Sequence, residues 1–389
     1  MFGIYLFLES KTRIYLLIFS ALSFGFSLYS YDAPKIFLPP FFLLIFYFQK
    51  EFLFKFKKYF SIFTLIFLVF YISILNITFL HGGLEHFSRA SIFNSIPDNV
   101  DSERFQTNAP LWLSSIFHNK LTVALKRFET SYVSIFSINW FFINGSGNLQ
   151  HAVGNHGEFY FFELPFFFIG LYIAFKKSKR LGFFLLGWMM LGALPGGLTD
   201  GNYAYRSVLL LPVPIIFSSL GIAWFWDLRS KKLIQLATRS ILLTIMAIYI
   251  ISYLHTYFFD YPVYASEYWN KQQNEALRFI SANKNKYKSV FVDGGEPWAI
   301  NYALFNKVDP KIYQNAYRNQ EIFNRIRVMK IDNVYFGIYQ LQYVSNPSNF
   351  FPKNSMIVTN ATNFPNKKYL KSFKDPGNIR DIFKVFAIE

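Results

Sequence analysis

The sequence predicts an α-helical membrane protein that crosses the bilayer several times and carries a soluble α/β domain at its C-terminal end. Three observations lead to this fold class: long apolar segments, Lys and Arg confined to alternate connections, and a change to soluble composition near residue 262. The 389 residues are 53 % hydrophobic and 21 % aromatic, which suits lipid-facing helices better than a soluble core. We therefore expect a polytopic membrane domain over 1–261 and a soluble domain over 262–389.

Seven apolar segments define the membrane domain. All but one contain 17 to 22 residues, and about 20 residues at about 1.5 Å each cross a hydrocarbon core of about 30 Å. The shorter one contains Pro39 and Pro40, which leaves its limits open. The segments lie near 14–30, 36–48, 59–80, 159–175, 181–198, 207–226 and 240–259.

The basic residues sort the connections between these segments into two sets. The positive-inside bias places Lys- and Arg-rich connections in the cytoplasm, and alternation then puts 31–35, 81–158, 199–206 and the chain after 260 on the outer side. Much of the net charge of +16 would meet anionic lipid head groups, so nucleic acid is not expected as a partner. The cytoplasmic residues would be Lys11, Arg13, Lys50, Lys55, Lys57, Lys58, Lys176, Lys177, Lys179, Arg180, Arg229, Lys231, Lys232 and Arg239.

The beginning of the chain, Met1 to Leu8, is apolar but short. It lacks the basic start and cleavage site of a signal peptide, and two interpretations stay open: the last turns of a longer membrane helix, or a short interfacial anchor. The chain contains no cysteine, which excludes disulfides, thiolate metal sites and a cysteine nucleophile.

The outer segment 81–158 is too long for a simple connector. Within it, apolar residues recur near helical spacing over 111–128, with Lys120, Lys126 and Arg127 off the apolar stripe. An amphipathic helix of this kind lies on the membrane surface or packs on the outer rim of the bundle. Both alternatives remain at this point.

The C-terminal domain alternates helix and strand patterns. We expect a helix over 267–281, a buried strand over 288–293 and a helix from 297 to 305. The Gly294-Gly295 turn between the last two weakly resembles a phosphate loop, but a tight turn is the favoured interpretation. Further strands are expected at 334–336, 356–359 and 383–388.

Ionisable residues are nearly absent from the apolar segments and gather at their predicted outer ends. Such residues near a membrane usually mark function, and a polar cavity just outside the bilayer, roofed by 81–158, would group them. They are Asp32, Lys35, Asp101, Glu103, His151, His156, Glu158, Glu163, Asp200 and Arg206.

Two cations in this set suit a lipid-linked phosphate. Arg206 offers a two-pronged donor to phosphate oxygens and Lys35 a point charge, although both are also typical snorkelling residues. Glu163 is expected to bind a sugar, orient a cation or pair with Arg206. His151 and His156 are five positions apart, which is not helical metal-ligand spacing, so no metal site is predicted.

Three stretches resemble membrane glycosyltransferases of the protein-mannosyltransferase and aminoarabinose-transferase type, the GT-C class (family 39-like). Lys35 and Pro39 match a hairpin that ends in a basic residue and Pro, and His151 and Glu163 match a His before a Glu-Leu-Pro helix start, with Gln150 where the family usually has Arg. Arg206 lies in a matching Ala-x-Arg-Ser helix entry. The stretches are YSYDAPKIFLPP (29–40), FFINGSGNLQHAVGNHGEFYFFELPFFFIGL (141–171) and PGGLTDGNYAYRSVLLLP (195–212).

The resemblance implies a GT-C-like bundle that passes a sugar from a polyprenyl-phosphate carrier to a glycan, lipid or protein acceptor outside the cytoplasm. Lys35, His151, Glu158, Glu163 and Arg206 would bind substrate. No cofactor is implied, and a divalent metal stays open.

The family's catalytic carboxylate lies in a first outer loop that would precede this chain. Asp32 and Asp101 are the replacement candidates, and an incomplete, split or degenerate enzyme is expected. The alternative function is a non-catalytic transporter, flippase or binding protein for lipid-linked glycans, although transporters tend to show paired repeats and none is visible here.

Overall fold

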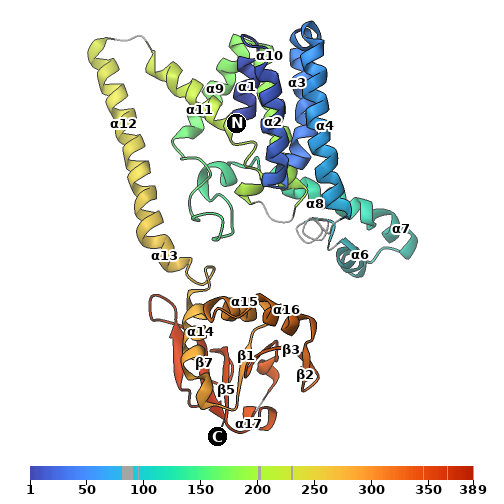
Figure 1. Ribbon diagram of the computed structural model, residues 1–389. Coiled ribbons are helices and arrows are strands. Elements are labelled where there is room, and N and C mark those ends of the chain that lie inside the picture. The colour runs from blue at the N-terminus through green and yellow to red at the C-terminus, as the bar shows by residue number, and fades with distance from the viewer. Residues whose placement is uncertain are drawn as a thin grey trace. The chain divides into compact units, whose positions relative to one another are not determined.

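The computed structural model describes residues 1–80, 91–94, 96–199, 203–228, 231–344, 346–365 and 367–388. The chain divides into two compact units, Met1–Tyr253 and Leu254–Glu389. The first unit is helical and the second contains a mixed β-sheet (Figure 1).

Helices occupy all seven apolar segments of the sequence, with shifted limits. The first unit also contains a π-helical turn, η1 (Asn139–Ile143), and a 3-10 turn, η2 (Ala204–Arg206). Its helices are α1 (Phe2–Glu9), α2 (Leu16–Ser30), α3 (Ala33–Lys55), α4 (Lys57–Leu80), α6 (Ile96–Phe105), α7 (Leu111–Phe117), α8 (Lys120–Ser134), α9 (Glu163–Lys177), α10 (Lys179–Gly197), α11 (Pro212–Trp226) and α12 (Lys232–His255).

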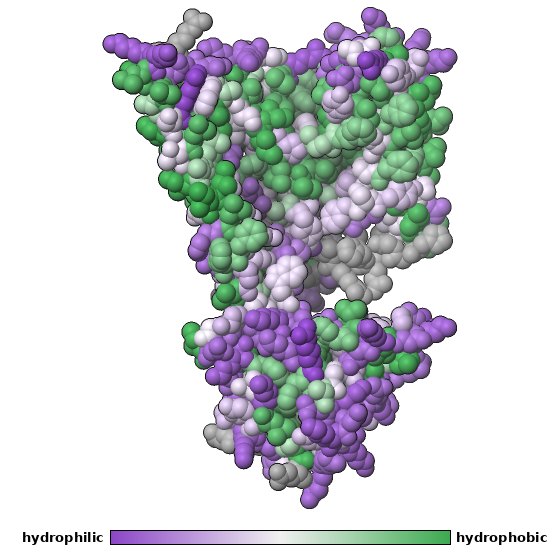
Figure 2. Space-filling model, turned by 60° about the vertical axis from the view of Figure 1, so that its left-hand side comes forward, coloured by the Kyte–Doolittle hydropathy of each residue, from purple (hydrophilic) through white to green (hydrophobic). Residues whose placement is uncertain are grey.

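Three helices of the described chain are long and apolar enough to cross a membrane. They are Ala33–Lys55, Lys57–Leu80 and Lys232–Tyr264, the last of which continues α12 through η3 (Thr256–Asp260) and α13 (Tyr261–Tyr264). Helices α2 and α11 are apolar but shorter. On the face seen in Figure 2, hydrophobic residues predominate over the middle of the helical unit, and hydrophilic residues gather at its upper end. This surface agrees with the membrane-associated class, while the predicted sidedness of the loops stays a prediction.

The limits of the second apolar segment, which the sequence left open, are those of a longer helix: 36–48 is part of the 23-residue helix α3. Pro39 cannot donate the helical hydrogen bond to the carbonyl of Lys35, which is four residues earlier. The Tyr71 hydroxyl on α4 donates to that carbonyl at 3.3 Å. A partner from the neighbouring helix thus satisfies the freed acceptor, and the helix continues through the proline pair.

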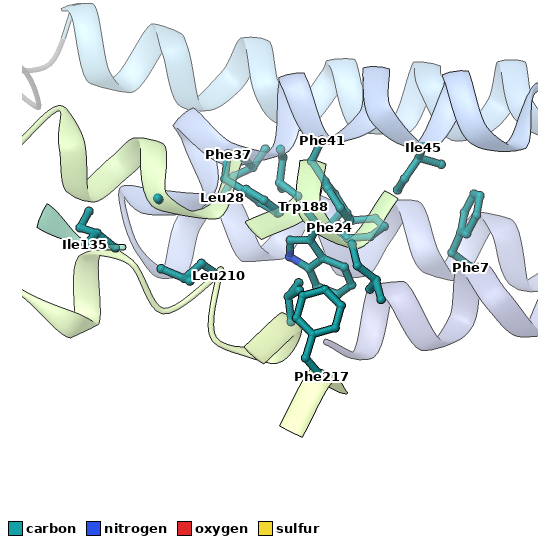
Figure 3. Packing of buried hydrophobic residues seen from close by; sticks show 14 of the residues in the cluster. Phe7, Phe24, Leu28, Phe37, Phe41, Ile45, Ile135, Trp188, Leu210 and Phe217 are labelled. Atoms are coloured by element: carbon teal, nitrogen blue, oxygen red, sulfur yellow. The ribbon is translucent and has the colours of Figure 1, made fainter. Parts of the chain in front are cut away.

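Aromatic side chains make up about half of the buried cluster inside the helical unit. Phe41 lies 5.2 Å from Trp188 between ring centroids, and both belong to one buried cluster with residues from several helices (Figure 3). The Trp188 indole donates to the carbonyl of Leu209 at 2.9 Å, so the buried ring also has its polar atom satisfied.

We expected a single helix over the amphipathic run at 111–128, but the structure contains two helices there. Helix α7 ends at Phe117 and α8 begins at Lys120. The side chain of Asn119 accepts from the backbone N–H groups of Leu121 and Thr122 at 2.9 and 3.1 Å. This N-terminal cap is worth about 1 kcal/mol and starts a new helix where the sequence pattern alone predicts continuation.

The second unit contains a seven-stranded sheet in the order β2-β3-β4-β1-β5-β7-β6. Strand β1 pairs in parallel with β4 and β5, and the remaining pairs are antiparallel. The strands are β1 (Ser289–Asp293), β2 (Glu321–Phe323), β3 (Ile326–Ile331), β4 (Val334–Gly337), β5 (Ser355–Asn360), β6 (Lys371–Lys374) and β7 (Asp381–Ile388). The helices are α14 (Lys271–Asn283), α15 (Glu296–Phe305), α16 (Pro310–Arg318) and α17 (Pro347–Phe350), besides α13.

Both faces of the central strand are buried, which confirms the prediction of a buried strand at 288–293. Val290 and Val292 pack in one cluster with residues of α14 and α15, and Phe291 packs in another with Tyr339 and Phe351. The strands predicted at 334–336, 356–359 and 383–388 are confirmed as β4, β5 and β7, whereas β2, β3 and β6 were missed. The missed strands are short or lie at or next to an edge of the sheet. There a strand can form with little alternation of apolar and polar residues.

The Gly294-Gly295 turn has a packing reason. A Cβ atom on Gly294 would lie 2.1 Å from Cδ1 of Trp298, which belongs to the buried cluster. Glycine therefore lets the Trp298 ring close over the end of β1. The packing of Trp298 therefore explains the glycine at position 294, and a role in phosphate binding is not needed to explain it.

Candidate functional site

The best-developed polar site of the first unit is built around Arg206. Its guanidinium carbon lies 4.7 Å from the ring centre of Tyr203 and 5.5 Å from that of Tyr205, and Nε donates to the Tyr205 hydroxyl at 3.1 Å. The two tyrosine rings are stacked, with centroids 5.6 Å apart. Cation–π contacts and the hydrogen bond together hold the guanidinium in one orientation.

His151 reaches the same place from the loop before α9. Its ring centroid is 4.4 Å from that of Tyr205 and 5.3 Å from that of Tyr203. The loop is folded by Asn148, whose side chain accepts from the N–H of Gln150 at 2.8 Å and whose carbonyl accepts from the N–H of His151 at 2.9 Å. Local turn chemistry thus presents the imidazole to the tyrosines.

The connection between α2 and α3 supplies a third group of residues to the site around Arg206. The Tyr31 ring lies 5.9 Å from that of Tyr205. Burial raises the pKa of the Tyr31 phenol, with a smaller opposing influence of Arg206, so the hydroxyl stays protonated. Next to it, Lys35 Nζ and Asp32 Oδ1 form an ion pair at 2.5 Å. We call Tyr31, Asp32, Lys35, His151, Tyr203, Tyr205 and Arg206 the Arg206 cluster.

The structure therefore brings together four of the residues singled out in the sequence: Asp32, Lys35, His151 and Arg206. It also gives Lys35 a carboxylate partner, so its ammonium is already neutralised in part. Asp101 is exposed on α6 and belongs to a different part of the unit. Asp200 and Arg229 lie outside the described residues.

The other ionisable residues have local partners. Glu103 Oε2 lies 2.9 Å from His118 Nδ1 and Oε1 lies 3.2 Å from Lys126 Nζ; these hydrogen bonds lower the pKa of Glu103 and join α6 to α8. His156 packs on the Tyr253 ring at 5.4 Å, and burial lowers its pKa. They hold the fold together rather than forming part of the cluster.

Two carboxylates are positioned by the loop that precedes α9. Glu163 Oε1 accepts from the backbone N–H of Tyr160 at 3.3 Å, and Glu158 Oε1 accepts from that of Ser146 at 3.1 Å. Gly145, which has a φ of +66°, is in contact with Glu158: a Cβ there would lie 3.2 Å from Oε1 and 2.4 Å from the carbonyl of His156. The left-handed glycine allows this close approach.

Burial raises the pKa of the Glu158 carboxyl above its ordinary 4.5. The folded state therefore holds a proton on Glu158 more tightly than the unfolded chain does. Ionised Glu158 destabilises the fold at neutral and higher pH, and this penalty disappears as the pH falls through the folded pKa toward 4.5.

We predict that Glu158→Gln raises the midpoint of thermal unfolding of the detergent-solubilised chain at about pH 8, because glutamine keeps the acceptor for Ser146 without a charge. The gain should shrink as the pH is lowered toward 4.5. Glu129→Gln, at an exposed position of α8, is the control. A gain for Glu158→Gln that does not change with pH would contradict the assignment.

Sequence reasoning missed the tyrosines of the cluster. Tyr31, Tyr203 and Tyr205 lie in the stretches that carry the family resemblance, but their roles become visible only through ring contacts between separate segments. Their concentration around Asp32 and Arg206, at helix ends, was the available indication, since Tyr gathers where a surface is both apolar and polar.

Chemically, the Arg206 cluster combines an oriented guanidinium, phenol hydroxyls, an imidazole and partly exposed aromatic rings. Such a set suits an anionic oxygen next to a polar ring. Among the described residues, no group of three or more His, Asp or Glu side chains is arranged to hold a metal ion.

The fold and site define a mostly helical protein with three helices able to span a membrane, a cationic aromatic cluster and a C-terminal mixed sheet. No protein-family model, curated protein or solved structure matches the chain. The functional assignment therefore rests on the chemistry of these residues.

Proposed function

We propose that this protein is a membrane glycosyltransferase that transfers a sugar from a polyprenyl-phosphate carrier to an acceptor on the outer side of a cell membrane. The observation that carries the proposal is the Arg206 cluster. Its residues come from all three stretches with glycosyltransferase resemblance, and their rings lie within 6 Å of their neighbours. A shared ligand site is the simplest reason for three separate segments to meet in this way.

The chemistry of the cluster fits the carrier. Arg206 immediately precedes the apolar stretch that becomes α11, so a phosphate bound there has its hydrocarbon chain beside apolar helices. In the transfer, the bond between the sugar's anomeric carbon and the phosphate oxygen breaks, and the leaving phosphate gains charge that Arg206 stabilises. The faces of Tyr203, Tyr205 and His151 suit the rim of a sugar ring.

The acceptor hydroxyl forms the new bond to the anomeric carbon and gives up its proton to a carboxylate. Within this proposal Asp32 is the candidate base, because it belongs to the cluster, whereas Asp101 lies on α6. Its carboxylate is positioned by the ion pair with Lys35 Nζ at 2.5 Å. Glu158 and Glu163 remain proposed contacts to the bound sugar.

The test is a binding and turnover experiment with the purified full chain in detergent or nanodiscs. We expect polyprenyl phosphate to bind at least about tenfold more tightly than the polyprenol of equal length, a difference of about 1.4 kcal/mol. A polyprenyl-phosphate sugar should be consumed, with release of polyprenyl phosphate, when an acceptor is supplied. Equal binding of the phosphate and the alcohol would overturn the site; phosphate-selective binding without cleavage would favour the binding or transport alternative.

A further inference from the structure

Helices α7 and α8 carry large apolar side chains that nothing in the described chain covers. Leu111 is 87 % exposed, Trp112 66 %, Phe117 64 % and Leu121 68 %. Scattered exposed apolar residues are ordinary in a protein surface, but six in a segment of fifteen mark a contact surface. We call this set the α7–α8 patch; it consists of Leu111, Trp112, Ile116, Phe117, Leu121 and Leu125.

The α7–α8 patch continues an apolar stripe of α8 that is partly covered by another helix. Leu121, Leu125, Phe128 and Tyr132 are three or four positions apart and share one helix face. Phe128 and Tyr132 pack on Gly197, the last residue of α10: a Cβ there would lie 3.2 Å from Phe128 Cε2 and 2.9 Å from Tyr132 Cβ. The second half of the stripe is therefore covered by an apolar helix, and the first half continues past it uncovered.

Two further contacts fix the position of α8 against α10 and α6. The Tyr132 hydroxyl donates to the carbonyl of Met190 on α10 at 2.9 Å. On another face, Val123 packs with Ile96 and Val100 of α6. Helix α8 thus packs on α10 through one face and on α6 through another. The exposed half of its apolar stripe points away from α6. Figure 1 shows α7 at the edge of the first unit.

We propose that the α7–α8 patch lies in the boundary between lipid head groups and acyl chains, so that α7 and α8 are interfacial helices bound to the bilayer. Helix α8 packs on Gly197, where the apolar helix α10 ends, and we place this end at the depth of that boundary. Covering these apolar side chains is favourable because it removes them from water, and Trp112 is of the residue type enriched at membrane interfaces. Lys120, exposed between the two helices, can meet anionic head groups.

This surface is separate from the proposed transfer reaction, because none of its residues belongs to the Arg206 cluster. Its proposed partner is a lipid bilayer rather than a second protein.

The absence of cysteine from the natural sequence makes the test direct. Single-cysteine variants Trp112→Cys, Phe117→Cys and Leu121→Cys are labelled with a nitroxide in the full chain reconstituted in phosphatidylcholine–phosphatidylglycerol vesicles. Thr130→Cys is the matched control: Thr130 is exposed on the face of α8 opposite to Leu121. Collision rates with oxygen, which concentrates in lipid, and with a water-soluble nickel complex then report the surroundings of each label.

We expect labels at 112, 117 and 121 to collide several-fold more with oxygen relative to nickel than the label at 130 does. Ratios equal to that of the control would overturn the proposal, because the patch would then face water. Immobile labels shielded from both reagents would also overturn it, because a protein surface would cover the patch. A folded state of each variant is checked by its elution volume before reconstitution.

Discussion

Replacing Arg206 with alanine is expected to weaken the binding of polyprenyl phosphate by about 10- to 100-fold. A hydrogen bond to a charged partner contributes about 1.5–3 kcal/mol, and about 1.4 kcal/mol corresponds to a factor of ten. The side chain is oriented by the rings of Tyr203 and Tyr205 and by the bond to the Tyr205 hydroxyl. The affinity for the neutral polyprenol should change little, because the alcohol offers no charge to the guanidinium.

Two variants separate recognition by the guanidinium from a general effect of charge. Arg206→Lys retains a cation but loses the planar donor and the ring contacts, so its affinity should fall between those of the wild-type and alanine proteins. Arg13→Ala removes an exposed arginine from the first connection and should leave the affinity unchanged. If Arg206→Ala elutes as the folded protein and binds polyprenyl phosphate as tightly as the wild type, Arg206 does not hold the phosphate.

Gly170→Val is expected to produce the largest loss of stability in the helical unit. A Cβ on Gly170 would lie 1.7 Å from the carbonyl oxygen of Phe217, and one on Gly221 would lie 2.0 Å from that of Phe166. The backbones of α9 and α11 therefore touch, and a side chain can enter only if the helices separate. Forcing extra atoms into a packed interior costs about 1–3 kcal/mol, and obstruction by a backbone places this variant at about 3 kcal/mol or more.

The measurement is the thermal unfolding midpoint of the detergent-solubilised chain, followed by the loss of the folded elution peak. Gly147→Val is the matched control, because no atom lies within 4 Å of the position of its added Cβ. Equal midpoints for the two variants would show that α9 and α11 do not rely on this close contact. Because α11 begins six residues after Arg206, the destabilised variant should also lose binding of polyprenyl phosphate.

Much of the secondary structure follows from local pattern. The apolar runs predict helices, and α2, α4, α9, α10, α11 and α12 lie where those runs lie. Helix α3 also covers an apolar run, but Pro39 and Pro40 inside it left its limits open. The hydroxyl of Tyr71 on a neighbouring helix takes the role that the missing proline N–H cannot fill, because it donates to the carbonyl that Pro39 leaves free. Similarly, the break between α7 and α8 depends on the cap by Asn119.

The candidate site was predictable in its charged members and not in its aromatic ones. Ionisable residues are conspicuous in an apolar sequence, so Asp32, Lys35 and Arg206 could be selected from the sequence. Tyrosine is common in this chain, with 26 copies, and composition cannot distinguish Tyr205 from the others. Its position between the rings of Tyr31 and His151 identifies it.

Local patterns in the chain are enough to specify where helices and central strands form, because burial of apolar runs and alternation along a strand are properties of neighbouring residues. Packing between distant elements sets which groups meet: Tyr31 and His151 around Tyr205, and the backbones of α9 and α11 at Gly170. These contacts join segments far apart in the chain, and their geometry depends on how helices pack rather than on any local pattern.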